Sequence, residues 1–319
     1  MARRIVSAAI VIALILGSGV LGSPRVRVAL DFFPNPNHVP LYVAIDMGFF
    51  AERGIEVEVV PPGEPSYVVR LAATRTVEVA LTPQMNFLIA KDAGLPLIAV
   101  AALIDRSLGG LLTLAEYGIK TLADLRGKTI GYSLAPLEPA LWRTVLACAG
   151  LTVDDVQLVN VGMMNTAQAL LLRQVDAIGA FRNFEPFQVE AQGRKPVFFP
   201  QEEYCIPETY EILAVVNPAV LLDRRSEIEA FVAGLAEGIA YTKAHPEEAF
   251  AAFLRARPDL DDALNRRSYE ATLPLYAEGA RHDDPAQWEK MQDYLFSSGL
   301  ISREYPLEEL YADLVSGKG

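Results

Sequence analysis

Hydrogen-bonding side chains and aromatic rings are concentrated in one short loop near the N-terminus, residues 31–38. The residues of interest are Asp31, Phe32, Asn35 and His38, with Asn37 between the last two. An apolar run, Val26–Leu30, precedes the loop, and an apolar helical segment follows it. Ligands of open α/β sheets bind beyond the carboxyl ends of strands, so this loop is predicted to form one wall of a small-molecule site.

A second group of such residues follows the apolar run Ala177–Phe181. If the chain stays extended there, its two-residue period places Phe181, Asn183 and Glu185 on one face. An aromatic ring can stack on a flat ligand, while the amide and the carboxylate accept hydrogen bonds from its N–H groups. Burial of Asn183 and Glu185 requires partners, so we interpret them as groups that bind an amino-bearing heterocycle.

Other polar side chains follow predicted strands or stand near helix starts. Those that complete the predicted substrate-binding set are Tyr42, Glu64, Gln84, Ser133 and Glu138. Tyr42 could face either the cleft or the core, and Glu64 could instead compensate a helix dipole. Few fixed positive charges occur among the candidates, which argues against a sulfonate or phosphate ligand.

Residues of the first loop also have structural alternatives. Asp31 could cap the turn rather than bind a ligand, and His38 could donate a hydrogen bond within its own loop. Phe32 could face the ligand or the core, whereas Phe33 is expected to be buried in the core.

The sequence contains no recognisable catalytic constellation. The patterns G-x-S-x-G and G-x-G-x-x-G are both missing. Gly127–Thr129 is similar to the end of a phosphate-binding loop, but Leu122 stands where that loop requires glycine. The three histidines are scattered, and no histidine or cysteine pair has metal-ligand spacing. We expect no catalytic residue, no metal and no cofactor.

The elements that must position these residues follow from the apolar pattern. Short apolar runs alternate with segments of helical periodicity, which predicts an α/β fold with mostly parallel sheets. The predicted strands are Val26–Leu30, Val57–Val60, Val77–Leu81, Leu97–Ala102, Leu111–Leu114, Thr129–Tyr132, Val156–Val161, Ala177–Phe181, Val197–Phe199 and Glu211–Val216. From Asp223 onward the predicted elements are helices, namely Arg225–Ala244, Glu247–Leu254, Asn265–Tyr276, Gln287–Ser298 and Leu307–Val315.

Residues 66–84 and 165–183 are similar to each other. Each segment has a polar helix start, an apolar helix, a tight loop, a strand and polar residues at the strand end. Equivalent units in two lobes would direct their strand ends toward a shared cleft. The alternative is the ordinary helix-then-strand repetition of any α/β protein.

Length and charge restrict the class of protein. A chain of 319 residues can form two domains of ordinary size. The net charge of -12 argues against nucleic acids and anionic membranes as partners.

The N-terminus has the order of an export signal. Arg3 and Arg4 precede the apolar run Ile5–Leu16, and a Gly/Ser-rich segment then leads to Ser23. Cleavage is expected near Gly22 or Ser23. The apolar run through Leu21 could instead persist as a membrane anchor, because its length is near the lower limit for a span. We expect a periplasmic or otherwise extracytoplasmic protein.

Two cysteines, Cys148 and Cys205, are far apart in the sequence. The apolar helical context of Cys148 is typical of a buried free thiol. An exported location permits a disulfide, but the sequence does not indicate one.

Several motifs resemble the substrate-binding proteins of bacterial ABC importers, specifically the branch for thiamine pyrimidines and riboflavin precursors. The motifs are residues 30–38, Gly48–Phe50 with Gly54 and Ile55, residues 125–132, and Val175–Ala177 with Asn183 and Glu185. The first motif is fairly specific, whereas the others are shared with sulfonate, taurine and nitrate binders. The resemblance extends from Val26 to Leu314. The family's usual tryptophan after Asp31 is Phe32 here, which offers less stacking area.

The resemblance implies an α/β, two-lobed periplasmic-binding-protein fold of type II with the ligand cleft between the lobes. Residues 1–23 would be the signal peptide or anchor, residues 24–112 and 214–319 lobe 1, and residues 113–213 lobe 2. The lobes would close on an aminopyrimidine thiamine precursor or a related heterocycle and deliver it to an ABC permease. An aromatic ring of the first loop would stack on the pyrimidine, and an acid of lobe 2 would hydrogen-bond to it. We expect a monomer.

The chain is also similar to the fungal pyrimidine synthases of thiamine biosynthesis. That resemblance would imply an enzyme with a pyridoxal-phosphate lysine and a nearby histidine, but Thr82 and Asn86 occupy these positions here. The cysteine-rich cluster of the synthases is also missing. We therefore favour a binding protein. A pyrimidine-phosphate synthase, a riboflavin- or sulfonate-type binding protein and an anchored sensor domain are the alternatives.

Overall fold

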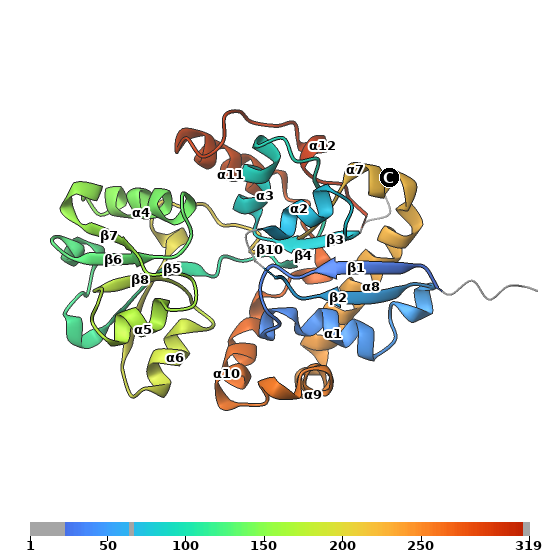
Figure 1. Cartoon of the computed structure of the whole chain (residues 1–319), viewed down its shortest axis with the longest axis horizontal. Helices are drawn as coiled ribbons and strands as arrows, with labels where there is room; N and C mark the ends of the chain where they lie inside the picture. The colour runs from blue at the N-terminus through green and yellow to red at the C-terminus, as the bar shows by residue number, and fades with distance from the viewer. Residues whose placement is uncertain (1–22, 64–66, 315–319) are drawn as a thin grey trace, which may run out of the picture.

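Two α/β lobes, each built on one five-stranded sheet, lie side by side in the computed structural model (Figure 1), which describes residues 23–63 and 67–314. The first-lobe sheet has the strand order β2-β1-β3-β10-β4, and the second-lobe sheet has the order β7-β6-β8-β5-β9. The strands are β1 (Arg25–Ala29), β2 (Glu56–Val60), β3 (Val79–Thr82), β4 (Ile98–Ile104), β5 (Gly109–Leu114), β6 (Thr129–Tyr132), β7 (Gln157–Asn160), β8 (Ala177–Phe181), β9 (Pro196–Pro200) and β10 (Ile212–Val216). Each predicted strand is present, and the α/β fold class is confirmed.

Four of the five strands in each sheet run in one direction, as the expectation of mostly parallel sheets requires, but each sheet is mixed because one strand is reversed. In the first lobe β1 runs parallel to β2 and β3, whereas β10 runs antiparallel to β3 and β4. The second lobe repeats this pattern, with β5 antiparallel to β8 and β9. The chain crosses from the first sheet to the second between β4 and β5, and it returns between β9 and β10. The antiparallel strands β5 and β10 are therefore the first strands after each crossing. The expected boundaries at 112/113 and 213/214 fall inside β5 and β10.

Helices cover both faces of each sheet (Figure 1). They are α1 (Val39–Asp46), α2 (Val68–Ala73), α3 (Gln84–Asp92), α4 (Leu137–Cys148), α5 (Thr166–Leu171), α6 (Glu185–Ala191), α7 (Pro218–Asp223), α8 (Arg225–Ala244), α9 (Pro246–Ala256), α10 (Ala263–Thr272), α11 (Pro285–Ser297) and α12 (Leu307–Leu310). The helix predicted over Leu307–Val315 ends at Leu310, because Tyr311 is extended and forms a bridge with Ala99 of β4. Val315 lies outside the described residues.

Helix α8 fixes the position of α1, which follows the first loop. Its apolar stripe, including Ile228, Phe231 and Leu235, is fully buried as predicted. A Cβ on Gly238 would lie 2.4 Å from the carbonyl oxygen of Pro40, so glycine is required for the close approach of these helices. The packing of α8 therefore holds the end of the loop at residues 31–38.

The two similar segments predicted from the sequence occupy equivalent places in the lobes. Helix α2 leads to β3, and α5 leads to β8, and each of these strands is third in its sheet. The tight turns also match, because Arg75 and Arg173 both have positive φ angles, 60° and 56°. The internal similarity therefore reflects two lobes with the same strand order.

A disulfide joins Cys148, the last residue of α4, to Cys205, which follows β9. The expectation of a buried free thiol at Cys148 is wrong, since both cysteines are exposed. Val145 and Leu146 take the buried face at this end of α4, and Cys148 lies on the outer face. The disulfide connects α4 to the segment that returns to the first lobe.

The predicted export signal, residues 1–22, lies outside the described residues. None of the helices formed by residues 23–63 and 67–314 has the length and apolar character needed to cross a membrane.

Candidate functional site

The loops that follow β1 and β8 meet between the lobes. The amide Nδ2 of Asn183, just after β8, donates to Oδ1 of Asn37 in the first loop at 2.7 Å and to Oγ1 of Thr272 in α10 at 2.8 Å. Asn183 is only 2% exposed. The candidate site is therefore the space between the lobes at the carboxyl ends of β1, β3, β6 and β8.

Side chains of the first loop hold one another in place. The buried ring of His38 donates from Nε2 to Oδ1 of Asp31 at 2.8 Å, because its Nδ1 accepts from the backbone N–H of Asn35 at 3.2 Å. Oδ1 of Asn35 in turn accepts from the backbone N–H of Asn37 at 2.8 Å. The structural alternative for His38 is therefore present in the loop, whereas Asp31 pairs with His38 and Asn35 is the residue that caps the turn. Asp31 retains a partly exposed carboxylate.

This network makes His38 a structural residue whose loss can be measured. We expect His38→Ala to lower the free energy of unfolding by about 1–3 kcal/mol, because Asp31 and the Asn35 N–H lose their buried partner. Urea unfolding of the variant measures the change. His245→Ala is the control, since His245 is exposed and its removal should cost less than about 0.5 kcal/mol. Equal stability of the His38 variant and the wild type would contradict this role.

Aromatic rings are exposed on both sides of the site. Phe33 is 44% exposed and Phe181 is 45% exposed, so the expectation that Phe33 is buried in the core is wrong. Phe32 is partly buried and packs edge-to-face on Phe33, with ring centroids 5.3 Å apart. Pro34 is buried instead, and the Phe33 ring faces outward. Large exposed rings beside a polar cleft are suited to stacking on a flat ligand.

The expectation that Phe181–Glu185 stays extended is wrong. Strand β8 ends at Phe181, and Glu185 begins α6, whose second residue is Pro186. A proline in the first turn favours helix initiation. The carboxylate of Glu185 folds back and accepts from the backbone N–H of Phe181 at 2.8 Å through Oε2. A turn therefore brings Glu185 back to the end of β8, rather than the two-residue alternation of an extended strand.

Glu138 reaches the same region from α4. It accepts from the backbone N–H of Ser133 at 2.6 Å and from the Ser133 hydroxyl at 3.0 Å. Burial raises the pKa of Glu138, and the hydrogen bonds from Ser133 oppose that rise. Ser133, at the end of β6, therefore acts here as a support for Glu138.

Two predicted residues are held by contacts within the first lobe or beside it, and a third lies outside the described residues. Tyr42 is buried and packs edge-to-face on Phe253 of α9, so it belongs to the core and not to the candidate site. Gln84 is fully buried, and its Oε1 accepts from the Tyr210 N–H at 3.2 Å. Its Nε2 has no hydrogen-bond partner among the described residues. Glu64 lies outside the described residues.

The structure adds charged residues that the sequence did not single out. Glu211 is buried between the lobes and accepts from the backbone N–H of Leu108 at 2.8 Å. Burial, assisted by the charge of Asp31, raises the pKa of Glu211 to about 7. The guanidinium of Arg182 pairs with Glu202, so this cation is already neutralised. The carboxyl groups near the cleft therefore exceed the cations that could bind an anionic ligand.

Thr272 is the other residue that sequence reasoning missed. It lies at the end of α10, 89 residues after Asn183, and carries no recognisable signal in the sequence. Its hydroxyl also donates to the Ser268 carbonyl at 2.7 Å. A second contact of α10 with the second lobe is formed by Arg267, which pairs with Glu190 of α6 and lies over the Phe187 ring. Helices α6 and α10 thus connect the lobes beside the cleft.

The contact at Thr272 gives a test of lobe closure. We expect Thr272→Val to weaken ligand affinity by about fivefold, because the closed arrangement loses one buried hydrogen bond worth about 1 kcal/mol. Small-angle scattering with and without ligand would report a less complete compaction. Thr242→Val is a matched control, because Thr242 is buried and bonds only the Gly238 carbonyl within α8. Equal effects of the two substitutions would contradict a role in closure.

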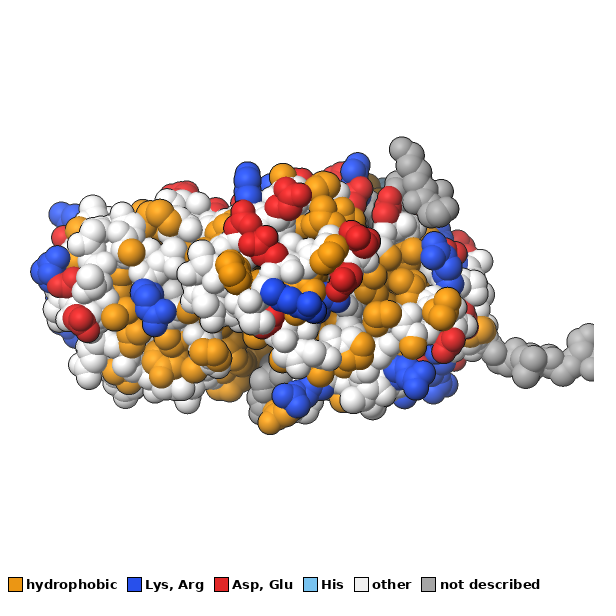
Figure 2. All heavy atoms as spheres, turned by 90° about the horizontal axis from the view of Figure 1, so that it is seen from above, with side chains coloured by type: hydrophobic (Ala, Val, Ile, Leu, Met, Phe, Trp, Pro, Cys, Tyr) orange, Lys and Arg blue, Asp and Glu red, His pale blue; other side chains and the backbone are white. Residues whose placement is uncertain are grey.

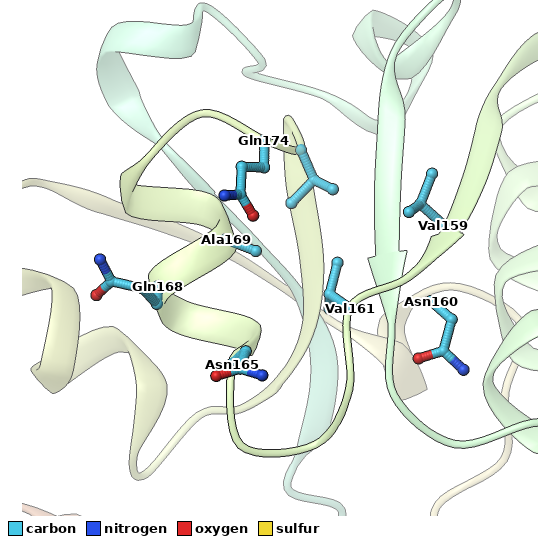
Figure 3. Close-up of a pocket in the computed structure, with 8 residues that line it drawn as sticks. Val159, Asn160, Val161, Asn165, Gln168, Ala169 and Gln174 are labelled. Atoms are coloured by element: carbon cyan, nitrogen blue, oxygen red, sulfur yellow. The ribbon is translucent and has the colours of Figure 1, made fainter.

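A separate surface pocket lies at the edge of the second lobe, between β7 and α5 (Figure 3). Asn165 and Gln168 come from α5 and the turn before it, whereas Val159 and Asn160 come from β7. None of the predicted site residues lines this pocket. The polar side chains that line this pocket are all uncharged amides. The pocket therefore does not include the carboxyl groups that lie between the lobes.

In the view of Figure 2, Lys and Arg side chains lie in small groups among acidic and apolar ones rather than forming one continuous basic face. Among residues 23–63 and 67–314, no cluster of three or more His, Cys, Asp or Glu side chains could hold a metal ion.

Comparisons with known proteins agree on one family. A family model described as NMT1/THI5 like matches residues 35–249. A Haemophilus influenzae protein named for thiamine biosynthesis is 34% identical over 306 residues, which are 95% of this chain and 96% of that protein. A formylaminopyrimidine-binding protein of Halalkalibacterium halodurans is 27% identical over 91% of this chain and 90% of its own length.

Other relatives are enzymes by name or share the fold alone. A Legionella pneumophila protein named 4-amino-5-hydroxymethyl-2-methylpyrimidine phosphate synthase is 25% identical over 91% of both chains. The periplasmic aliphatic sulphonate binding protein of Escherichia coli superposes with a TM-score of 0.71 at 14% identity, covering 89% of this chain and 91% of that one. Both lobes therefore follow the fold of periplasmic binding proteins.

Proposed function

Because this chain belongs to the NMT1/THI5-like family, we propose that it is an exported solute-binding protein of an ABC importer. We further propose that its ligand is an aminopyrimidine thiamine precursor or a related flat heterocycle. The protein binds this ligand between its lobes, carries out no reaction on it and presents the closed form to a membrane permease.

The observation that carries the proposal is the chemistry of the cleft. Carboxyl groups of Asp31, Glu138 and Glu185 lie at the strand ends, and the nearby cation Arg182 is paired with Glu202. Such a site favours amino-bearing ligands over sulfonates and phosphates. The exposed rings of Phe33 and Phe181 provide apolar surface for a flat ring.

The ligand-binding set for this proposal is Asp31, Phe32, Phe33, Phe181, Asn183, Glu185 and Glu138. Asn183 has two roles in it, because its Nδ2 joins the lobes while its Oδ1 is buried with no partner among the described residues. An N–H group of the ligand would satisfy that oxygen. Asn35, His38 and Ser133 support the site through the hydrogen bonds described above.

Export is supported by the disulfide between Cys148 and Cys205. Such bonds persist in oxidising compartments and are rare in the cytosol. The formylaminopyrimidine-binding relative and the periplasmic fold neighbour agree with an extracytoplasmic location.

The alternative is a pyrimidine-phosphate synthase, which the name of the Legionella pneumophila relative favours. A Schiff base with pyridoxal phosphate needs a lysine amine. Thr82, at the position of that lysine, is a buried residue of β3, and Asn86 stands in α3 at the position of the histidine. Absorbance of bound pyridoxal phosphate in the purified protein would support the enzyme.

A thermal-shift screen tests the proposed function. The panel is 4-amino-5-hydroxymethyl-2-methylpyrimidine, a formylaminopyrimidine, thiamine, riboflavin and an alkanesulfonate. A ligand at 100 times its dissociation constant stabilises the folded state by about 2.7 kcal/mol, so its unfolding midpoint must rise. We expect the pyrimidines to raise the midpoint most. A rise with the sulfonate alone would contradict the proposal.

A further inference from the structure

Two carboxyl groups of the second lobe lie over the same end of β8. The carboxylate of Glu185 accepts from the backbone N–H of Phe181. Two residues earlier, a Cβ on Gly179 would lie 3.2 Å from Oε2 of Glu138. Glycine at this position therefore leaves the space in which Glu138 rests against the strand. Both side chains are partly buried, so their interaction is screened by water less than at an open surface.

The hydrogen bonds of the two groups are unequal. Each oxygen of Glu138 accepts one hydrogen bond from Ser133, from its N–H or from its hydroxyl. The N–H of Leu134 adds a third donor to Glu138, whereas Glu185 has only the backbone N–H of Phe181, on Oε2, and its own backbone N–H among the described residues. Donors stabilise the ionised form, so Glu138 is the better site for the negative charge and Glu185 is the better site for a proton.

On the described elements that pack on α6, the arginines near Glu185 are already paired with other carboxylates. Helix α6 packs on α5, α10, β8 and β9, and α5, β8 and β9 contain no titratable side chain. On α10, Arg267 pairs with Glu190 and Arg266 pairs with Glu247, while Glu270 is exposed. Beside β8, Arg182 pairs with Glu202. Burial raises the pKa of Glu185 to about 7, and the charge of Glu138 adds to that rise.

We propose that Glu138 is ionised and Glu185 is protonated, and that the two carboxyl groups form hydrogen bonds with two adjacent groups of the ligand. The O–H of Glu185 donates to a ring nitrogen, while Glu138 accepts from the neighbouring amino group. This inference rests on the proposed function and deepens it, because it selects rings with an acceptor nitrogen beside an amino substituent. A carboxylate at Glu185 would instead have required a second N–H donor on the ligand.

The pair can be tested in the ligand-free protein. Carbon NMR of protein labelled at its glutamate carboxyl groups would follow Glu185, whose signal is identified by its loss in Glu185→Gln. We expect its pKa to be about 7 in the wild type and lower in Glu138→Gln, since the neighbouring charge has been removed. A pKa near the ordinary value of 4.5, or one that Glu138→Gln leaves unchanged, would overturn the pair. Circular dichroism establishes that both variants are folded.

Binding of 4-amino-5-hydroxymethyl-2-methylpyrimidine then tests which hydrogen bonds the two carboxyl groups form with the ligand. A glutamine amide can keep the Phe181 hydrogen bond and donate from its NH₂ group as the protonated acid does. We expect Glu185→Gln to bind within about threefold of the wild type at about pH 6, and to lack the loss of affinity that the wild type shows above about pH 7. The pKa of the ring nitrogen of the probe is measured separately, and the comparison of the two proteins is made at a pH above it, where the probe is neutral.

A loss of more than about tenfold in Glu185→Gln at the same pH would overturn the inference. If the probe binds neither protein at any pH, the proposed function fails. The NMR titration of the free protein still decides whether the carboxyl pair exists.

Discussion

Glu185→Ala is expected to weaken binding of an aminopyrimidine by about 10- to 100-fold, which corresponds to about 1.4–2.8 kcal/mol. The substitution removes the group that we propose to bind the ligand and leaves the N–H of Phe181 without its acceptor. Isothermal titration calorimetry of the two proteins measures the change.

Glu203→Ala is a suitable control, because Glu203 is an exposed glutamate outside the candidate site. Its affinity should equal that of the wild type. An unchanged affinity in Glu185→Ala would remove Glu185 from the binding site and, with it, the acid on which the ligand assignment depends.

Replacement of both Cys148 and Cys205 by serine is expected to lower the free energy of unfolding by about 2–4 kcal/mol. The disulfide joins residues 57 positions apart, and closing a loop of this length restricts the unfolded chain. Urea unfolding followed by circular dichroism measures the loss.

Reduction of the wild type provides the matched control for the double serine variant. The reduced wild type and the variant should have the same stability, since both lack only the covalent link. A variant as stable as the oxidised wild type would show that the disulfide contributes nothing to the folded state. Ligand affinity should change little, because neither cysteine belongs to the candidate site.

The fold was predictable because its strands have a strong local signal. Runs such as Val26–Leu30 and Ala177–Phe181 are apolar, bounded by polar or turn residues, and of strand length. The mixed direction of the sheets was not predictable from such runs. It depends on β5 and β10, which each enter their sheet from the other lobe, and strand direction leaves no mark in the apolar pattern.

The candidate site was predictable only where the residues are close in sequence. The hydrogen bonds among Asp31, Asn35 and His38 span at most seven residues, and the structural alternative for His38 was already visible. Glu185 was placed on an extended strand although the following Pro186 is typical of a helix start. The proline rule would have corrected that prediction.

Contacts between the lobes could not be predicted at all. Asn183 was identified as buried and polar, but its partners Asn37 and Thr272 lie 146 and 89 residues away. The disulfide is a similar case, because its two cysteines come together only when α4 packs beside the segment after β9. Such pairings are consequences of the folded arrangement rather than of local sequence.

The central claim is that the cleft binds an unphosphorylated amino-bearing ring. Calorimetric titration of the exported form of the protein with 4-amino-5-hydroxymethyl-2-methylpyrimidine and with its phosphate tests it most directly. The account predicts saturable binding of the free pyrimidine with one ligand per chain. It also predicts binding of the phosphate that is weaker by about tenfold or more, because Asp31, Glu138 and Glu211 disfavour an anion. Equal or tighter binding of the phosphate, or no heat with either compound, would contradict the account.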